Sequence, residues 1–117
     1  MSEEEIREFV KRFYEALDAG DAETASALFP DGTKIHLWDG TVFTTQAEFR
    51  AWFEKLYSTS DNASRSVVSF KVDGNVAEVE VVLKANIKGR EKVVKLKHIF
   101  HFEGDKLVEV EVSIEPL

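Results

Sequence analysis

The 117-residue sequence contains no cysteine, which excludes disulfides, a thiol nucleophile and cysteine-ligated metal centres. Positive charge is scarce: 15 Lys and Arg face 22 Asp and Glu, and the formal net charge is −7. This balance, with no basic run to offset it, argues against nucleic-acid binding. No apolar run is long enough to span a membrane, and the acidic N-terminus is unlike a signal peptide. We therefore expect a soluble protein with neither nucleic-acid nor membrane partners.

Several motifs with known chemistry are also missing. The sequence has no Gly-rich phosphate loop, no His-Glu-x-x-His helix and no Gly-x-Ser-x-Gly elbow. Its three histidines, His36, His98 and His101, are not spaced along the chain like zinc ligands, so we expect no metal site.

The length is that of one domain, residues 1–117. Helical periodicity dominates the first half of the sequence. Apolar residues recur every three or four positions from Glu3 to Asp18, which predicts a helix, and Ser2 with Glu5 forms a capping box before it. A short second helix follows Asp21 and stops before Pro30. A third helix follows Thr45, and its apolar stripe is unusually aromatic: Phe49, Trp52, Phe53, Leu56 and Tyr57.

Strand patterns fill the remainder. Strands are predicted over Thr33–Trp38 and Thr41–Thr44, joined by an Asp39-Gly40 turn, and a polar loop over Ser58–Asn62. Four further strands are predicted over Ala63–Val72, Val76–Ile87, Arg90–Phe102 and Lys106–Glu115. The last of these presents Val108, Val110, Val112 and Ile114 on one face. The order predicts an α+β fold: a cone of three N-terminal helices packed on a curved, mostly antiparallel six-strand sheet that encloses an apolar pocket.

Four polar residues stand out against this apolar pattern. Tyr14 brings a hydroxyl into the first helix's apolar stripe, and Asp18 lies one turn further on, where the helix dipole disfavours a carboxylate. His98 lies on the inner face of its strand and needs a hydrogen-bond partner, for which Tyr14 is available. It is either a satisfied core histidine or a functional one.

Arg65 is ambiguous from alternation alone. Strict alternation places it on the face opposite Phe70, as a solvated arginine near a strand end. A β-bulge near Val67-Val68 would instead turn it inward, where Asp18 could hold it. An inward Arg65 would present its remaining donors to an anionic ligand.

Candidate pocket walls are mostly aromatic. Either His36 with Trp38, or Ile35 with Leu37, faces the pocket, and His101 points outward into solvent. Aromatic residues more often form core than ligand wall, but their density favours a flat aromatic ligand. The candidate wall comprises Trp38, Phe49, Trp52, Phe53, Leu96 and Val110.

The chain resembles the nuclear transport factor 2-like superfamily, most clearly from Glu8 to Asp21. More closely, Tyr14 with Asp18, the segment from Ile35 to Gly40, Arg65 and His98 resemble the de novo designed luciferases built on this fold. The resemblance implies a cofactor-independent luciferase that oxidises a synthetic imidazopyrazinone luciferin, of the diphenylterazine or coelenterazine type, with dioxygen as co-substrate.

In that resemblance Arg65 stabilises the anionic luciferin, Asp18 orients Arg65, and Tyr14 with His98 forms a second dyad at the substrate's polar core. It further implies a designed protein without a native location, cytoplasmic when expressed. Dense Glu and Lys on the outer sheet face argue for a monomer. Two alternatives remain: a ketosteroid-isomerase-like proton-transfer enzyme with Asp18 or His98 as base, and a non-catalytic scaffold that binds a small molecule.

Overall fold

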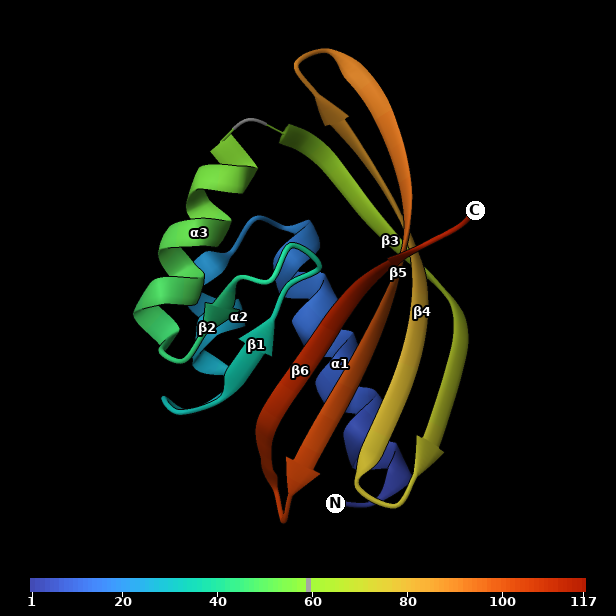
Figure 1. Cartoon of the computed structure of the whole chain (residues 1–117). Helices are drawn as coiled ribbons and strands as arrows, with labels where there is room; N and C mark the ends of the chain where they lie inside the picture. The colour runs from blue at the N-terminus through green and yellow to red at the C-terminus, as the bar shows by residue number, and fades with distance from the viewer. Residues whose placement is uncertain (59) are drawn as a thin grey trace.

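The helices lie on one side of a curved sheet (Figure 1). The computed structural model describes residues 1–58 and 60–117, and the side chains of all of these except 60 and 61. The helices are α1 (Glu3–Asp18), α2 (Ala22–Ala27) and α3 (Gln46–Ser58). The predicted number and order of helices are confirmed, and the capping box of α1 is formed by reciprocal hydrogen bonds between Ser2 and Glu5.

The sheet has six strands in the spatial order β2-β1-β6-β5-β4-β3. Their bounds are β1 (Lys34–His36), β2 (Val42–Phe43), β3 (Ser60–Asp73), β4 (Val76–Ile87), β5 (Arg90–Glu103) and β6 (Lys106–Glu115). Every neighbouring pair is antiparallel except β1 and β6, which are parallel. The predicted mostly antiparallel, six-strand α+β architecture is therefore confirmed.

The predicted polar loop over Ser58–Asn62 is wrong where the chain is described. Ser58 closes α3, and β3 begins at Ser60, which pairs with Ile87 of β4. Thr59 lies outside the described residues. Asn62 takes a positive φ of 51° beside a register shift between Asp61 and Ser64. The polar segment thus stays in the sheet because a bulge accommodates it and β4 supplies hydrogen-bond partners.

A second bulge corrects the predicted inner face of the last strand. His101 pairs with Glu109 but Phe102 pairs with Leu107, which leaves Val108 as the extra residue. Leu107 is consequently 2% exposed and belongs to the core, although alternation alone had placed Val108 there. Simple alternation fails at this end of β6 because the bulge offsets Leu107 by one position from the residues after it, whereas Val110, Val112 and Ile114 keep the predicted face.

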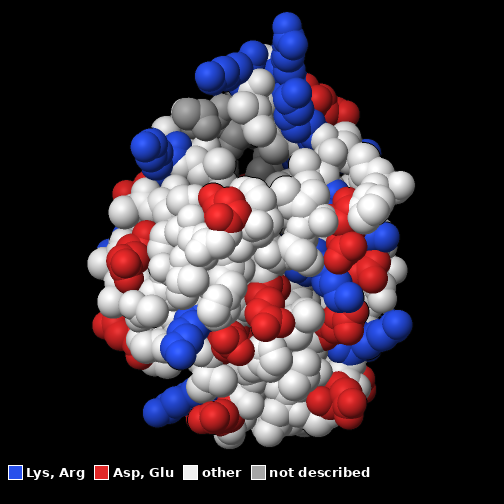
Figure 2. All heavy atoms as spheres, viewed as in Figure 1, with Lys and Arg blue, Asp and Glu red and all other residues white. Residues whose placement is uncertain are grey.

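The surface carries charges of both signs. Figure 2 shows several Lys and Arg side chains at the top of this view, over the β4–β5 hairpin, and basic and acidic side chains intermixed over the rest of this face. Among the described residues, no helix combines the length and apolarity that a membrane crossing requires.

Candidate functional site

An apolar cavity of about 250 Å³ lies between the helices and the inner face of the sheet. All six predicted wall residues line it: Trp38, Phe49, Trp52, Phe53, Leu96 and Val110. Phe49 and Phe53 are buried in a stacked pair whose ring centroids lie 6.0 Å apart. The aromatic stripe of α3 thus forms both core and cavity wall, because its rings pack against Phe43 of β2 and also border the cavity.

The inner face of β1 is the apolar one. Ile35 and Leu37 are buried and line the cavity, whereas His36 points outward and bonds Glu109 through Nε2 at 2.8 Å. Trp38 lies beyond the end of β1, so alternation no longer governs it. It lines the cavity while 49% exposed, and its ring packs edge-on against Trp52.

The exposed lining residues define the mouth of this cavity. Trp38, Leu56 and Ile114 all border it and are 49%, 41% and 51% exposed. Leu56 and Ile114 were not among the predicted ligand contacts. Leu83 and Val94 were missed as well, although all four lie on apolar faces that the helical and strand periodicities identified.

Arg65 points inward, as the bulge hypothesis required. The register of β3 against β4 shifts between Val67 and Ser69, so Arg65 pairs with Leu83 and Phe70 pairs with Val79, both on the inner face. The Arg65 side chain is only 9% exposed. The hypothesis of a solvated arginine is therefore wrong, because the extra residue at Val68 reverses the alternation of the preceding segment.

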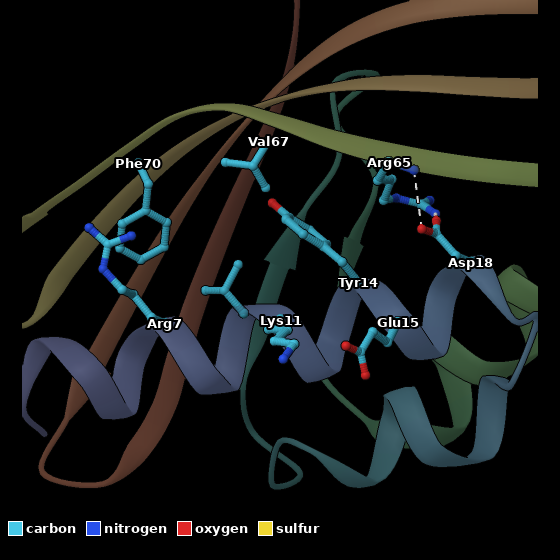
Figure 3. A pocket seen from close by; sticks show the side chains of 9 residues that line it. Arg7, Lys11, Tyr14, Glu15, Asp18, Arg65, Val67 and Phe70 are labelled. Atoms are coloured by element: carbon cyan, nitrogen blue, oxygen red, sulfur yellow. Dashed lines mark hydrogen bonds and ion pairs between the residues drawn. The ribbon is translucent and has the colours of Figure 1, made fainter.

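Asp18 holds Arg65 by two contacts (Figure 3). Its Oδ1 accepts from Arg65 Nη1 at 2.6 Å, and its Oδ2 accepts from the Arg65 backbone N–H at 3.1 Å. The Asp18 side chain remains 30% exposed. The carboxylate at the end of α1 thus has the cationic partner that offsets its unfavourable position in the helix dipole.

Arg65 stands between two hollows. It lines the inner cavity and also an outer cleft of about 330 Å³ between α1 and β3, which Tyr14 and Asp18 border as well. Its Nε is buried and has no hydrogen-bond partner within the described part of the chain. A buried donor of this kind is costly unless a ligand satisfies it.

Tyr14 and His98 form the predicted second pair. The Tyr14 hydroxyl lies 2.8 Å from His98 Nδ1, and both side chains are buried. Burial, assisted by the nearby positive charge of Arg65, lowers the pKa of His98 from 6.5 to about 3. Burial raises the pKa of Tyr14 above its ordinary value, against the opposing charge of Arg65. Both groups are therefore neutral at pH 7, and Arg65 supplies the fixed charge of the site.

The outer cleft has a mixed charged rim (Figure 3). The Arg7 guanidinium lies 4.3 Å from the centre of the Phe70 ring, while Lys11 and Glu15 extend from α1 on the side away from β3. Among the described residues that line the inner cavity, by contrast, none is an Asp or Glu. The cavity can therefore stabilise an anion through Arg65, but it offers no carboxylate as a general base.

A curved sheet that encloses an apolar cavity with its N-terminal helices defines the nuclear transport factor 2-like class of domains. Within that class, residues 10–110 match the sequence profile of the SnoaL-like domain, and the chain belongs to this family. A comparison with curated protein sequences finds no significant match.

Solved structures with the same fold are distant in sequence. A protein of unknown function from Burkholderia pseudomallei K96243 has a TM-score of 0.85 at 19% identity, covering 98% of this chain and 92% of its own. A putative SnoaL-like polyketide cyclase from Jannaschia sp. CCS1 has a TM-score of 0.82 at 12% identity, with coverages of 98% and 90%. An epoxide hydrolase from M. tuberculosis has a TM-score of 0.80 at 13% identity, with coverages of 95% and 83%. At these identities the likeness concerns the fold.

Proposed function

We propose that this chain is a cofactor-independent luciferase, which binds a flat imidazopyrazinone luciferin of the diphenylterazine or coelenterazine type and oxidises it with dioxygen. The observation that carries the proposal is the Arg65 guanidinium, fixed by Asp18 at the wall of an apolar cavity. This arrangement suits a substrate that is mostly apolar and becomes anionic at its polar centre. No metal or organic cofactor is part of the proposal.

The charge of Arg65 drives the first step. The luciferin passes its proton to solvent at the cavity mouth, and the resulting anion is electron-rich enough to react with dioxygen. A nearby cation favours this anion. At an effective dielectric constant near 20, unit charges about 4 Å apart attract by about 4 kcal/mol, which is about a thousand-fold in the ionisation equilibrium. Asp18 offsets part of this charge and, in return, keeps the guanidinium in place.

Tyr14 and His98 serve the same step as a neutral hydrogen-bonding pair. Because the pKa of His98 is lowered to about 3, its ring stays uncharged and can exchange hydrogen bonds with the substrate's polar core. The Tyr14 hydroxyl fixes the orientation of that ring at 2.8 Å. The pair therefore orients the heterocycle, while Arg65 provides the electrostatic stabilisation.

The apolar walls bind the flat substituents and exclude water, which would quench an excited product. The cavity volume of about 250 Å³ lies slightly below the range of about 300–1,000 Å³ for small-molecule sites. A luciferin with several aryl groups would therefore extend through the mouth, where Trp38, Leu56 and Ile114 offer apolar contact. Solvent access at the mouth also lets dioxygen enter.

A ketosteroid-isomerase-like proton-transfer enzyme is the second candidate and fits the site less well. It needs a base in the cavity, whereas Asp18 is bound to Arg65 and borders the outer cleft. With a pKa of about 3, His98 is a weak base at neutral pH. The third candidate, a non-catalytic binding scaffold, requires only the apolar cavity.

Photon counting tests the proposal directly. Purified protein mixed with diphenylterazine in air should emit well above the luciferin alone, and Arg65→Ala should lose about 10²–10³-fold, as when an electrostatic stabiliser is removed. Arg12→Ala is the matched control, because that arginine is exposed on α1 and pairs with the exposed Glu8 one turn away. It should stay within about twofold of the parent.

The other outcomes separate the candidates. Equal light from the parent and Arg65→Ala would remove the role proposed for Arg65. Tight binding of diphenylterazine without light would favour the non-catalytic scaffold. Isomerisation of a β,γ-unsaturated ketosteroid, without light, would favour the proton-transfer enzyme.

A further inference from the structure

The outer face of the sheet gathers metal-ligating side chains from three adjacent strands, far from the cavity. His101 lies on β5, Glu109 and Glu111 on β6, and His36 on β1. His101 Nε2 lies 3.6 Å from Glu111 Oε2 and 4.0 Å from Glu109 Oε1. His36 Nε2 contacts the second oxygen of Glu109 at 2.8 Å.

His101 is the unusual member of this group. Strand alternation predicted a solvated side chain. The side chain does point outward, but it is only 32% exposed and its Nε2 is buried. Within the described part of the chain, that nitrogen has no hydrogen-bond partner. Two carboxylates lie close to it, yet neither reaches hydrogen-bond distance. A cation placed between this ring nitrogen and the two carboxylates would contact all three groups.

We propose that His101, Glu109 and Glu111 bind a divalent transition-metal ion, with Zn²⁺ as the best fit. Zinc takes histidine nitrogen and carboxylate oxygen at about 2.0–2.2 Å, so neighbouring ligand atoms in a tetrahedral site lie about 3.3 Å apart. One atom from each of the three residues already falls within 4.8 Å of the others. Small rotations of the two carboxylates close the remaining gap, and solvent fills the fourth position.

His36 is not one of the proposed ligands, but it orients the ligand Glu109. Its 2.8 Å contact holds one oxygen of Glu109 and leaves the other directed toward His101. Outer partners that orient a ligand in this way commonly change metal affinity by 10- to 100-fold. The net charge of −7 also attracts a dication to this face.

The proposed ion would brace the short strand β1, which pairs with β6 through only three residues. β1 has three residues, and its parallel pairing with β6 positions Leu37 and Trp38, which follow it, at the cavity. The ion would bridge β5 and β6 directly and reach β1 through Glu109 and His36. Its effect is therefore a more stable sheet, independent of the chemistry proposed for Arg65.

Calorimetric titration of the untagged, chelator-treated full chain with ZnCl₂ at pH 7.5 tests this site. We expect one ion per chain, and His101→Ala and Glu111→Gln should each weaken binding at least tenfold. His36→Ala should weaken it less. Glu78→Gln is the control, because this glutamate lies on the same sheet face but bonds Lys97. The zinc affinity of this variant should equal that of the parent.

Cobalt provides an independent measurement, because tetrahedral Co²⁺ absorbs visible light strongly. The parent should show this absorption and His101→Ala should lose it, with circular dichroism showing that both are folded. Zinc should also raise the melting temperature of the parent but not of His101→Ala. Absence of binding at 1 mM zinc, or 1:1 binding unchanged in His101→Ala, would overturn the proposal and leave a network of ion pairs.

Discussion

At the scale of single residues, burial decides which groups of the site carry charge. His98 and Tyr14 are buried together and remain neutral, whereas Arg65 keeps its charge because guanidinium is protonated at any accessible pH and Asp18 stands beside it. The site therefore has one permanent cation and one uncharged hydrogen-bonding pair. This division of roles yields separate predictions for pH and for mutation.

Acid should destabilise the fold through His98. Between pH 6.5 and about 3 the unfolded chain binds a proton at this residue that the folded chain does not, so the free energy of unfolding falls as pH falls. The slope approaches about 1.4 kcal/mol per pH unit. Urea unfolding of the parent and of His98→Gln should be measured between pH 4.5 and 6.5, because the surface carboxylates that titrate in the lower part of this range are the same in both proteins and cancel in the comparison. His98→Gln should show a flatter profile, and parallel profiles for both proteins would contradict the assignment.

The Tyr14–His98 pair should behave as one unit. Tyr14→Phe and His98→Ala each remove one side of the same 2.8 Å hydrogen bond, so the second substitution has less left to lose. We expect the double variant to lose less light and less stability than the sum of the singles, by about 1 kcal/mol for a buried hydrogen bond. A double-mutant cycle measures this coupling, and additive effects would show that the two groups act separately.

At the scale of elements, the corner between α1 and α2 depends on Gly20. This residue has a φ of +70°, and a Cβ there would lie 2.3 Å from two ring atoms of Tyr57 on α3. Gly20→Ala should therefore cost about 2–4 kcal/mol of stability, from the left-handed backbone and from overpacking. Gly74→Ala is the control: its φ is +60° but open space surrounds it, so only the backbone cost of about 1–2 kcal/mol applies. Equal losses in denaturant unfolding would show that Tyr57 moves away freely.

Elements with strong local signals were predictable from the sequence. Capping at Ser2, the aromatic stripe of α3 and the alternation of the last three strands are all patterns among neighbours in the chain, and these elements were confirmed. Bulges were harder, since they depend on how two strands align. The shift at Val68 was only one of two options. The one at Val108 was missed because Val108 continues the apolar alternation of Val110 and Val112 without a break, so no local pattern marks the bulge.

The candidate site was predictable to a similar extent. Tyr14 and His98 were expected to meet because periodicity placed both inside, and the structure brings them together. The mouth residues Leu56 and Ile114 were missed, since a partly exposed apolar residue looks like any other core position in sequence. The outer group around His101 was also missed, because its spacing arises across strands rather than along the chain.

At the scale of the whole molecule, the sheet should resist self-association. The outer face of its central strands carries ion pairs, Lys95 with Glu80 and Lys97 with Glu78, and the edge strand β3 is interrupted by two register shifts. Charged faces and bulged edges are both poor templates for a second copy. Light scattering after size exclusion should give one chain mass, 13.3 kDa, at micromolar concentration. Twice that mass would contradict this prediction, and loss of the dimer on Val67→Lys would then assign the interface to the exposed valines of β3.

Because Arg65 lies between the inner cavity and the outer cleft, a change of charge at the cleft can alter the electrostatic potential inside the cavity. Whatever alters the potential on the cleft side, such as a reversed charge at Lys11, a bound anion or a change in salt, is felt by the same guanidinium that faces the cavity. The ionisation of a bound ligand can thus be changed without altering the apolar walls that contact it.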